Sequence, residues 1–300
     1  MEKNGQIGVA LAGGGLQGFS HIGALRALEE LGVKIDYISG TSTGSLFASL
    51  YAMGFTTDEM EEIMKEKYQK IIRFSKKAIV KAMVNYLRIK ETRTEGLIDG
   101  KVVEKLMNDE AIKKDIYKIA DVKKRNLAIA TVDTKTMKEC IFTSRRPACE
   151  DESFYYIEDI TIGKAVQASM AFPGIFTPVN YDNYNFIDGG TVDNLPVKPL
   201  RDMGAKKIIA IAFDLSDYKI TNNLENVVLR ALDIFSSADV KEAEKMSDVA
   251  IEILNRETGL LKMDKMEDTV KHGYQAVMDK KEEILSLLTN DLSNPIEKIS

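Results

Sequence analysis

Short apolar runs of strand length alternate along the chain with stretches in which apolar residues recur at helical spacing. The runs that predict strands cover residues 6–12, 35–39, 126–132, 139–143, 207–213 and 249–254, and Phe186 and Ile187 end a further strand. The helical spacing predicts helices over residues 22–31, 45–53, 161–170 and 266–288. Because strands that alternate with helices form mainly parallel sheets, we expect an α/β fold whose central sheet is covered on both faces.

A helical region interrupts this alternation after the second strand-turn-helix unit. Thr56 and Glu59 have the spacing of a capping box, which predicts the start of a helix, and helical character continues to about Lys90. The chain has no internal repeat and no low-complexity linker. The expected units are a main domain over residues 1–215, a helical insertion within it at about 56–118, and an extension over 216–300 that packs on the same domain.

The composition is that of an ordinary globular chain, since 44% of the 300 residues are hydrophobic, 29% are charged and only 6 are Pro. The sequence has no run of eighteen apolar residues, the length needed to span a membrane, and the apolar run 7–12 is shorter than the core of a signal peptide. We therefore expect a cytoplasmic protein. In that compartment Cys140 and Cys149 are expected to be reduced thiols rather than a disulfide.

The net charge of -5 and the pI near 5.4 argue against nucleic acid as a partner, because a phosphate backbone needs a basic surface. One segment departs from this balance. Between Lys65 and Arg93, ten Lys or Arg stand against Glu66 and Glu91, and basic and apolar residues occupy different sides of a helical wheel. This basic segment, 65–93, is a covering helix with a solvated face, a lid, or a contact with an anionic membrane surface, where each cation contributes about 1 kcal/mol.

The first candidate site is a glycine-rich loop between the first predicted strand and helix. Residues 13–18 read Gly-Gly-Gly-Leu-Gln-Gly, and Asp36 follows at the distance found in dinucleotide-binding folds. The same glycines would let main-chain amides approach a developing oxyanion, or simply form a tight turn. The loop alone therefore leaves a dinucleotide site, an oxyanion hole and a structural turn open.

The second candidate site is Gly-Thr-Ser-Thr-Gly at residues 40–44, between a predicted strand and a buried helix. This is the context of a nucleophile elbow, a strained turn that exposes the central serine at the carboxyl edge of the sheet. Gly40 and Gly44 let the neighbouring backbones pass closely. Ser42 is therefore the candidate nucleophile, while Ser39 and Ser45 are expected to be structural.

A serine nucleophile needs a base, and the chain has only two histidines. His272 falls on the polar side of its predicted helix, where we expect it to be solvated. His21 lies close to the glycine loop and is expected to support that turn rather than to remove a proton. Neither histidine is therefore the expected base.

A carboxyl group is the remaining candidate base. Asp188 ends a short apolar strand and is followed by Gly189 and Gly190, so its side chain is expected at the same sheet edge as Ser42. A carboxylate with an ordinary pKa near 4 is a poor match for a serine hydroxyl, so it must contact the hydroxyl directly. The alternative is that Asp-Gly only forms a turn.

Together these motifs resemble the patatin-like phospholipases, lipid acyl hydrolases with a Ser-Asp dyad. The resemblance covers about residues 7–213 and rests on the loop 13–18 with His21, the elbow 40–44, and Asp188-Gly189-Gly190 with Asn194. It implies a three-layer α/β/α fold, a patatin-like catalytic domain over 1–215, and neither metal nor cofactor. The site residues it implies are Ser42 as nucleophile, Asp188 as base, the amides of Gly13, Gly14 and Gly15 as oxyanion hole, and Gly18, Gly40, Gly44, Gly189 and Gly190 as supporting glycines.

The expected function is hydrolysis of fatty-acyl esters of lipids through an acyl-enzyme, with a lipid substrate as the partner. One residue departs from the family pattern, because Gln17 stands where the family commonly carries Arg or Lys. A catalytically idle lipid-binding or regulatory protein is therefore one rival interpretation. The other is a dinucleotide-dependent oxidoreductase built on the glycine loop.

Overall fold

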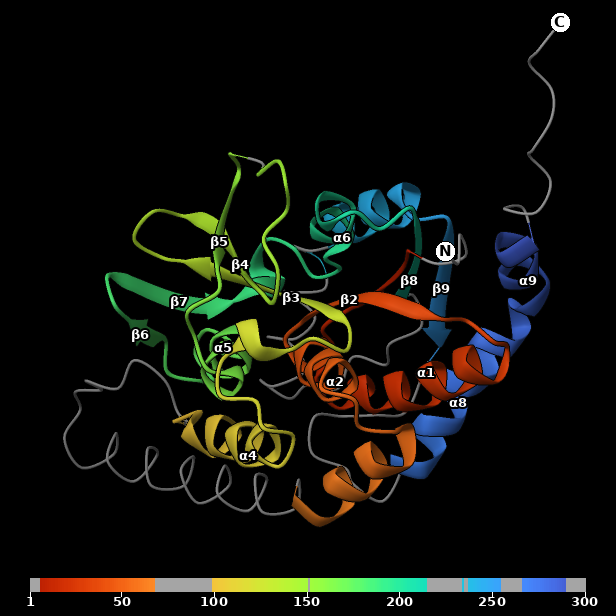
Figure 1. Ribbon diagram of the computed structural model, residues 1–300, viewed down its shortest axis with the longest axis horizontal. Helices are drawn as coiled ribbons and strands as arrows, with labels where there is room; N and C mark the ends of the chain where they lie inside the picture. Colours follow the sequence, from red (N-terminus) through yellow and green to blue (C-terminus); the bar gives the residue numbers. More distant parts are fainter. Residues whose placement is uncertain are drawn as a thin grey trace, which may run out of the picture.

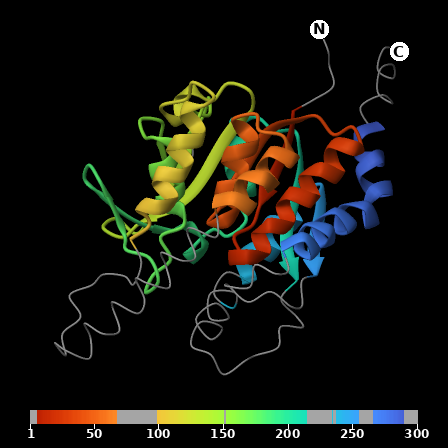
Figure 2. The ribbon, with the colours of Figure 1, turned by 90° about the horizontal axis from the view of Figure 1, so that it is seen from below.

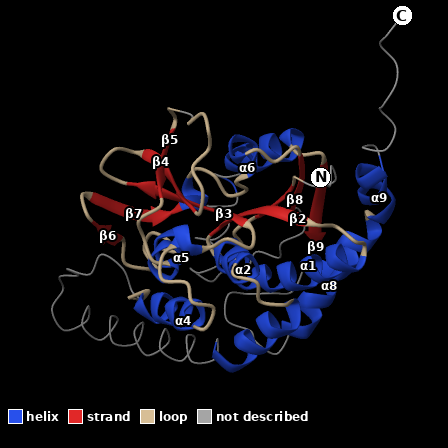
Figure 3. Cartoon of the chain, in the orientation of Figure 1, coloured by secondary structure: helices blue, strands red, loops and turns tan. Residues whose placement is uncertain are grey.

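The computed structural model describes residues 6–67, 99–150, 152–214, 234, 237–254 and 266–289. Within these residues nine strands form one sheet, in the order β5-β4-β3-β2-β1-β8-β9, with β7 added to β3 and β6 to β7 (Figures 1 and 3). The strands are β1 (Ile7–Leu11), β2 (Ile35–Thr41), β3 (Asn126–Asp133), β4 (Lys138–Thr143), β5 (Phe154–Ile157), β6 (Val179–Tyr181), β7 (Tyr184–Asp188), β8 (Lys207–Asp214) and β9 (Val249–Leu254).

The centre of the sheet is parallel, as the alternation of strands and helices predicts. Strands β3, β2, β1, β8 and β9 pair in parallel, whereas β3 pairs antiparallel with both β4 and β7. Val9, Ile38, Ile129 and Ile209 of the central strands are fully buried, because helices cover both faces of the sheet. The carboxyl ends of β1, β2 and β3 therefore lie at one edge.

The helices form a layer on each side of the sheet, which gives the expected three-layer α/β/α fold (Figure 1). Helices α1, α2, α4, α5 and α8 lie on one side, where Figure 2 views them from the front, and α6 packs on β1, β2 and β8 from the other. The helices are α1 (Ser20–Glu30), α2 (Thr43–Ala52), α4 (Lys101–Ile112), α5 (Ile162–Ser169), α6 (Val197–Met203), α8 (Met266–Asp279) and α9 (Lys281–Thr289), with further helices over 57–67 and 237–246.

The expectation of one continuous helix over 266–288 is wrong, since α8 and α9 are separate helices. The break falls at Lys280, whose N–H bonds the Val277 carbonyl three residues back and tightens the last turn of α8. After the break, α9 brings the Leu287 carbonyl to the Lys207 Nζ on β8 at 2.6 Å. No Gly or Pro marks this position in the sequence, so the helical pattern runs through it unchanged.

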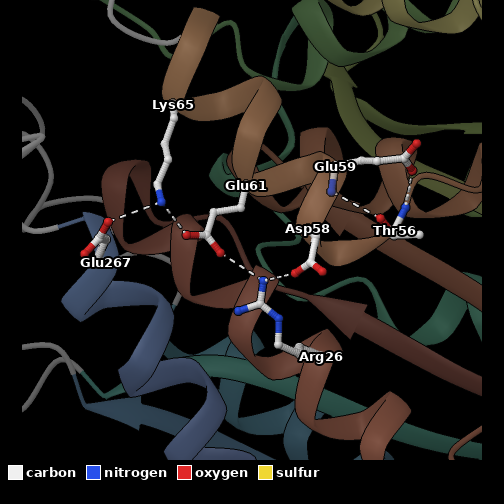
Figure 4. Close-up of polar contacts among 7 residues, drawn as sticks. All are labelled: Arg26, Thr56, Asp58, Glu59, Glu61, Lys65 and Glu267. Atoms are coloured by element: carbon white, nitrogen blue, oxygen red, sulfur yellow. Dashed lines mark hydrogen bonds and ion pairs between the residues drawn. The ribbon is translucent and has the colours of Figure 1, made fainter.

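The predicted capping box is confirmed at the start of helix 57–67. The Glu59 carboxylate accepts a hydrogen bond from the Thr56 N–H at 2.7 Å, and the Thr56 hydroxyl accepts one from the Glu59 N–H at 3.1 Å (Figure 4). These reciprocal bonds satisfy amides that the first turn of a helix leaves unpaired. The pattern of residue types at 56–59 therefore identified the helix start correctly.

Ion pairs join helix 57–67 to α1 and α8 (Figure 4). Arg26 of α1 binds Asp58 and Glu61, each at 2.9 Å. Lys65 bridges Glu61 at 2.8 Å and Glu267 of α8 at 3.2 Å. Asp58 and Glu267 are mostly exposed, whereas Arg26 and Glu61 are only partly exposed. Each pair has at least one partner in contact with solvent and contributes about 1 kcal/mol, so the network mainly orients the helix.

The basic segment 65–93 falls largely outside the described residues, which resume at residue 99. Its described start is bound to acidic side chains, since the Lys67 Nζ lies 3.2 Å from the buried carboxylate of Glu110 on α4. Among the described helices, none has the length and apolar character needed to cross a bilayer. Cys140 is buried on β4 and Cys149 is exposed, both as free thiols.

Candidate active site

Ser42 lies on a sharp turn between β2 and α2, at the carboxyl edge of the sheet. Its backbone has φ 52° and ψ -125°, a conformation that residues other than glycine rarely adopt and that costs about 1–3 kcal/mol. The flanking glycines make the turn possible, because a Cβ on Gly40 would collide with the backbone of Gly44. A Cβ on Gly44 would collide with the Leu11 carbonyl of β1. The turn at Ser42 is therefore sharp, and neither Gly40 nor Gly44 has room for a side chain.

Strand β3 brings Ser42 and Asp188 together although they are far apart in sequence. The last residue of β2, Thr41, pairs with Ala130 of β3. The next residue of β3, Thr131, pairs with Asp188 at the end of β7. Strand β3 therefore pairs with β2 up to Ala130 and with β7 from Thr131 onward. The Ser42 turn and the Asp188 carboxyl group lie next to each other where the pairing changes.

Asp188 is buried, with 2% of its surface exposed, and its carboxyl group hydrogen-bonds the Ser42 side chain. The Oδ1 also accepts the Gly190 N–H at 2.8 Å. Burial raises the pKa of Asp188 to about 7, although the bonds from Gly190 and Ser42 favour the charged form and partly offset the burial. The shift removes the mismatch expected of an ordinary carboxylate, because a base works best with a pKa near the working pH.

The glycine-rich loop passes directly beside the elbow. A Cβ on Gly13 would lie 3.0 Å from the Ser42 Cβ and 2.6 Å from the Asn194 Oδ1. A Cβ on Gly18 would lie 2.7 Å from the Thr43 Oγ1, which follows the elbow serine. These approaches explain why the loop needs glycine at both positions.

The three amides expected to form an oxyanion hole are not equivalent. The Gly13 N–H donates to the Asn194 carbonyl at 3.2 Å, so it is already used. The Gly14 N–H makes only a long bond of 3.3 Å to the Thr43 Oγ1. The Gly15 N–H, at a residue with φ 58°, has no acceptor among the described residues. Among these three amides, the weakly bonded Gly14 N–H and the Gly15 N–H are therefore the donors left for an anion.

Neither histidine contacts Ser42 through any hydrogen bond among the described residues. His21 is fully buried, and its Nε2 lies 2.8 Å from the Ala12 carbonyl just before the glycine loop. Burial lowers the pKa of His21 to about 4, so the ring is neutral at pH 7 and donates its Nε2–H to that carbonyl. His272 is exposed on α8. The expectations that His21 supports the loop and that His272 is solvated are both confirmed.

The segment after Asp188 connects the other two motifs. The Ser39 hydroxyl donates to the Pro196 carbonyl at 2.6 Å, and the Thr41 hydroxyl donates to the Asp193 carbonyl at 2.9 Å. The Asn194 side chain adds a bond to the Gly13 carbonyl at 3.2 Å. Residues 189–196 thus fix the glycine loop and the elbow in one arrangement, a role that the sequence motifs did not reveal.

Two neighbouring carboxyl groups, Asp193 of this segment and Glu139, affect each other's pKa. Asp193 hydrogen-bonds Glu139 of β4, and burial raises the pKa of both carboxyl groups. The charge of Asp193 raises the pKa of Glu139 further, whereas the hydrogen bond from Glu139 favours the charged form of Asp193. The charge of Lys198 lowers the pKa of both groups, and the charge of Asp239 raises it. Glu139 therefore retains its proton more strongly than an ordinary glutamate and can donate it to Asp193, so the two groups do not pack as like charges.

The arrangement does not match a dinucleotide site. Asp36, the acid expected at the ribose, is the second residue of β2 and lies at the amino end of the strand, about 17 Å from the edge that carries the loop. A Cβ on Gly14 would lie 2.5 Å from the Phe213 ring, so the loop packs against the protein on that side. No group of three or more potential metal ligands occurs within the described ranges.

A comparison with protein families matches residues 9–201 to the patatin-like phospholipase family. The match spans both the glycine loop and Asp188, and it covers more than half of the chain. The chain belongs to this family. The resemblance carried by the motifs is thereby confirmed, and so is the three-layer fold that it implies.

Two relatives match about 70% of the chain. Lysophospholipase NTE1 of Meyerozyma guilliermondii is 29% identical over 212 residues, which are 70% of this chain and 13% of that protein. Human patatin-like phospholipase domain-containing protein 6 is 30% identical over 207 residues, 68% of this chain and 13% of that protein. The chain therefore spans about an eighth of the length of these relatives.

Two solved structures align with most of this chain. VipD from Legionella pneumophila aligns with a TM-score of 0.48 at 15% identity, covering 92% of this chain and 66% of that one. ExoU in its complex with SpcU from Pseudomonas aeruginosa aligns with a TM-score of 0.47 at 17% identity, covering 94% and 52%.

Proposed function

We propose that this patatin-like phospholipase is a serine hydrolase that cleaves fatty-acyl esters of lipids through a Ser42–Asp188 dyad. The observation that carries the proposal is the hydrogen bond between the Ser42 side chain and a buried carboxyl group whose pKa is raised to about 7. A base with this pKa is partly ionised at neutral pH and holds a transferred proton far better than an ordinary aspartate. No histidine is needed.

The reaction begins when the Ser42 Oγ attacks the acyl carbonyl and its proton passes to Asp188. The amides of Gly14 and Gly15 stabilise the negative charge that develops on the carbonyl oxygen. Collapse of the tetrahedral intermediate breaks the ester bond, and the leaving alcohol takes the proton from Asp188. Water then attacks the acyl-enzyme with Asp188 again accepting a proton, which returns to Ser42 as the free fatty acid leaves.

A phospholipid or a lysophospholipid is the proposed substrate, supported by the names of the relatives and by the family. The reaction requires neither metal nor cofactor. We place it in the cytoplasm, with residues 65–93 as a covering helix, a lid or a transient contact with an anionic membrane surface. The proposed catalytic domain is 1–215, with the helical insertion at 56–118. The extension over 216–300 adds β9 to the sheet edge and α8 against α1.

The test is replacement of Ser42 by alanine. Hydrolysis of p-nitrophenyl butyrate and release of fatty acid from lysophosphatidylcholine vesicles should fall at least about 10³-fold, since the nucleophile is lost. Ser49→Ala is the matched control, because Ser49 is a buried serine of α2, the helix that Ser42 precedes, and its hydroxyl donates to the Ser45 carbonyl at 2.7 Å. Ser42→Ala with normal turnover would refute the proposal.

An idle lipid-binding protein is the second candidate function, favoured by one observation. Gln17 is buried in the glycine loop, and its Oε1 would lie 3.4 Å from a Cβ on Gly14. A neutral side chain therefore packs in the loop where the family commonly carries a cation. Such a protein would bind anionic vesicles and leave a fluorophosphonate probe unreacted. An active hydrolase labels with the probe at Ser42.

A further inference from the structure

A buried hydroxyl stands between the elbow and strand β3. The Ser169 Oγ accepts a hydrogen bond from the Ser42 N–H at 2.9 Å and donates one to the Ala130 carbonyl at 2.7 Å. Ser169 is the last residue of α5 and is fully buried. Because its own proton goes to Ala130, its lone pairs are left to face the Ser42 amide.

This hydroxyl occupies the place of a sheet hydrogen bond. The Thr41–Ala130 pair is the last between β2 and β3, and the Ser42 amide follows it directly. If the Ser42 N–H bonded the β3 backbone itself, the ladder would continue and draw Ser42 into an extended conformation. The inserted hydroxyl satisfies both backbone groups while Ser42 keeps φ 52°.

The helix that carries Ser169 is fixed at its other end. The Thr161 hydroxyl caps α5 by accepting the Lys164 N–H at 3.2 Å, and the Asn108 side chain of α4 accepts the Gly163 N–H at 2.9 Å. Gly163 packs so closely on α4 that a Cβ there would collide with the Glu104 carbonyl. The position of the Ser169 hydroxyl is therefore set by rigid elements rather than by a loop.

We propose that Ser169 is a positioning residue that holds the Ser42 backbone in the strained conformation needed to aim its hydroxyl at Asp188. The inference rests on the proposed function. The Ser169 hydroxyl bonds two main-chain groups, the Ser42 N–H and the Ala130 carbonyl, so its loss is expected to lower the rate of the chemical step and to leave substrate binding unchanged. Kinetically, kcat falls and KM stays constant.

The experiment compares Ser169→Ala, Ser169→Thr and Ser144→Ala in the full chain. Ser144 is the matched control, since it is 6% exposed and its Oγ accepts the Leu127 N–H of β3 at 2.8 Å, at the end of the strand remote from Ser42. Both alanine variants lose one buried acceptor for a main-chain amide. The measurements are kcat and KM for p-nitrophenyl butyrate, the rate of fluorophosphonate labelling, and the melting temperature.

For Ser169→Ala we expect kcat and the labelling rate to fall at least tenfold with KM within twofold of the parent value. Ser169→Thr, which keeps the hydroxyl, should recover kcat to within threefold. Ser144→Ala should lower the melting temperature by a similar amount and leave kcat unchanged. If Ser169→Ala does not fold, Ser169→Cys fills the same space with a weak acceptor, and the same fall in kcat is expected of it.

A kcat within twofold of the parent in the folded Ser169 variant would overturn the inference. So would an equal loss of kcat in Ser144→Ala, because the effect would then be one of stability. Failure of the inference differs from failure of the proposed function. If Ser42→Ala is inactive while the Ser169 variants are normal, only the positioning role is wrong, whereas an active Ser42→Ala refutes the nucleophile itself.

Discussion

Replacement of Asp188 by asparagine should stabilise the fold at neutral pH while it abolishes activity. Asparagine has nearly the same shape and keeps an oxygen that can accept the Gly190 N–H. It carries no charge, so it removes the cost of ionising a carboxyl group that is almost fully buried. The most damaging change to the proposed chemistry is therefore expected to give the more stable protein.

The pKa of Asp188 sets the magnitude and the sign. Burial raises this pKa from 3.8 to about 7 in the folded protein. At about 1.36 kcal/mol for each unit, ionisation of the folded state costs about 4 kcal/mol of unfolding free energy. The folded state holds the Asp188 proton more tightly than the unfolded chain does, so the protonated group contributes this free energy to stability below about pH 4. The contribution is lost as the pH rises from about 4 to 7 and is absent above that.

The assay is equilibrium unfolding in urea at several pH values between about 4 and 8. The unfolding free energy of Asp188→Asn should exceed that of the parent by about 4 kcal/mol at pH 8, and this difference should shrink by the same amount toward pH 4. A difference that is independent of pH, or an asparagine variant that is less stable at pH 8, would refute the reasoning.

Asp133 offers a control of opposite sign. It is also buried, at 1% exposure, and burial alone would raise its pKa, but hydrogen bonds from Asn185, Thr136 and Lys135 outweigh this and hold the pKa below its usual value. The charged form is therefore favoured in the fold. Asp133→Asn should be less stable than the parent at pH 8, by about 1–3 kcal/mol.

Three further predictions concern pH and packing. The kcat/KM for p-nitrophenyl butyrate should rise with pH to a plateau with an apparent pKa of about 7, because Asp188 must be ionised to accept the Ser42 proton; a flat profile between pH 5 and 9 would contradict this role. Gly44→Ala should cost at least about 2 kcal/mol in urea unfolding, because its Cβ would collide with the Leu11 carbonyl, and wild-type stability would argue against the tight elbow. The pKa of His21 is lowered from 6.5 to about 4, so about 3 kcal/mol of stability should be lost as the pH falls through this window; His21→Gln should remove this loss, and equal acid sensitivity in both proteins would count against a neutral His21.

The sequence predicted the parallel centre of the fold and the position of the site at its carboxyl edge. Both follow from local patterns, because a buried strand needs a continuous apolar run and a close backbone approach needs glycine. Gly40 and Gly44 are clear cases, since any Cβ would collide with main-chain atoms. The order of the motifs along the chain is enough to identify the family.

Features that depend on distant pairs of residues were not predictable in the same way. Nothing local to Thr131 says that it pairs with Asp188, and nothing local to Asn194 says that its carbonyl takes the Gly13 amide. The raised pKa of Asp188 likewise depends on burial by the whole fold. The role proposed for Ser169 could not be predicted either, because it depends on hydrogen bonds to β3 and to Ser42 rather than on its own helix.

The most direct test of the dyad is the rate and site of labelling by a fluorophosphonate, followed by mass spectrometry of the digested protein. The account predicts one adduct on the peptide that contains Ser42, formed at least about 100-fold more slowly in Asp188→Asn. The same labelling rate in Asp188→Asn, or an adduct on any other residue, would contradict it.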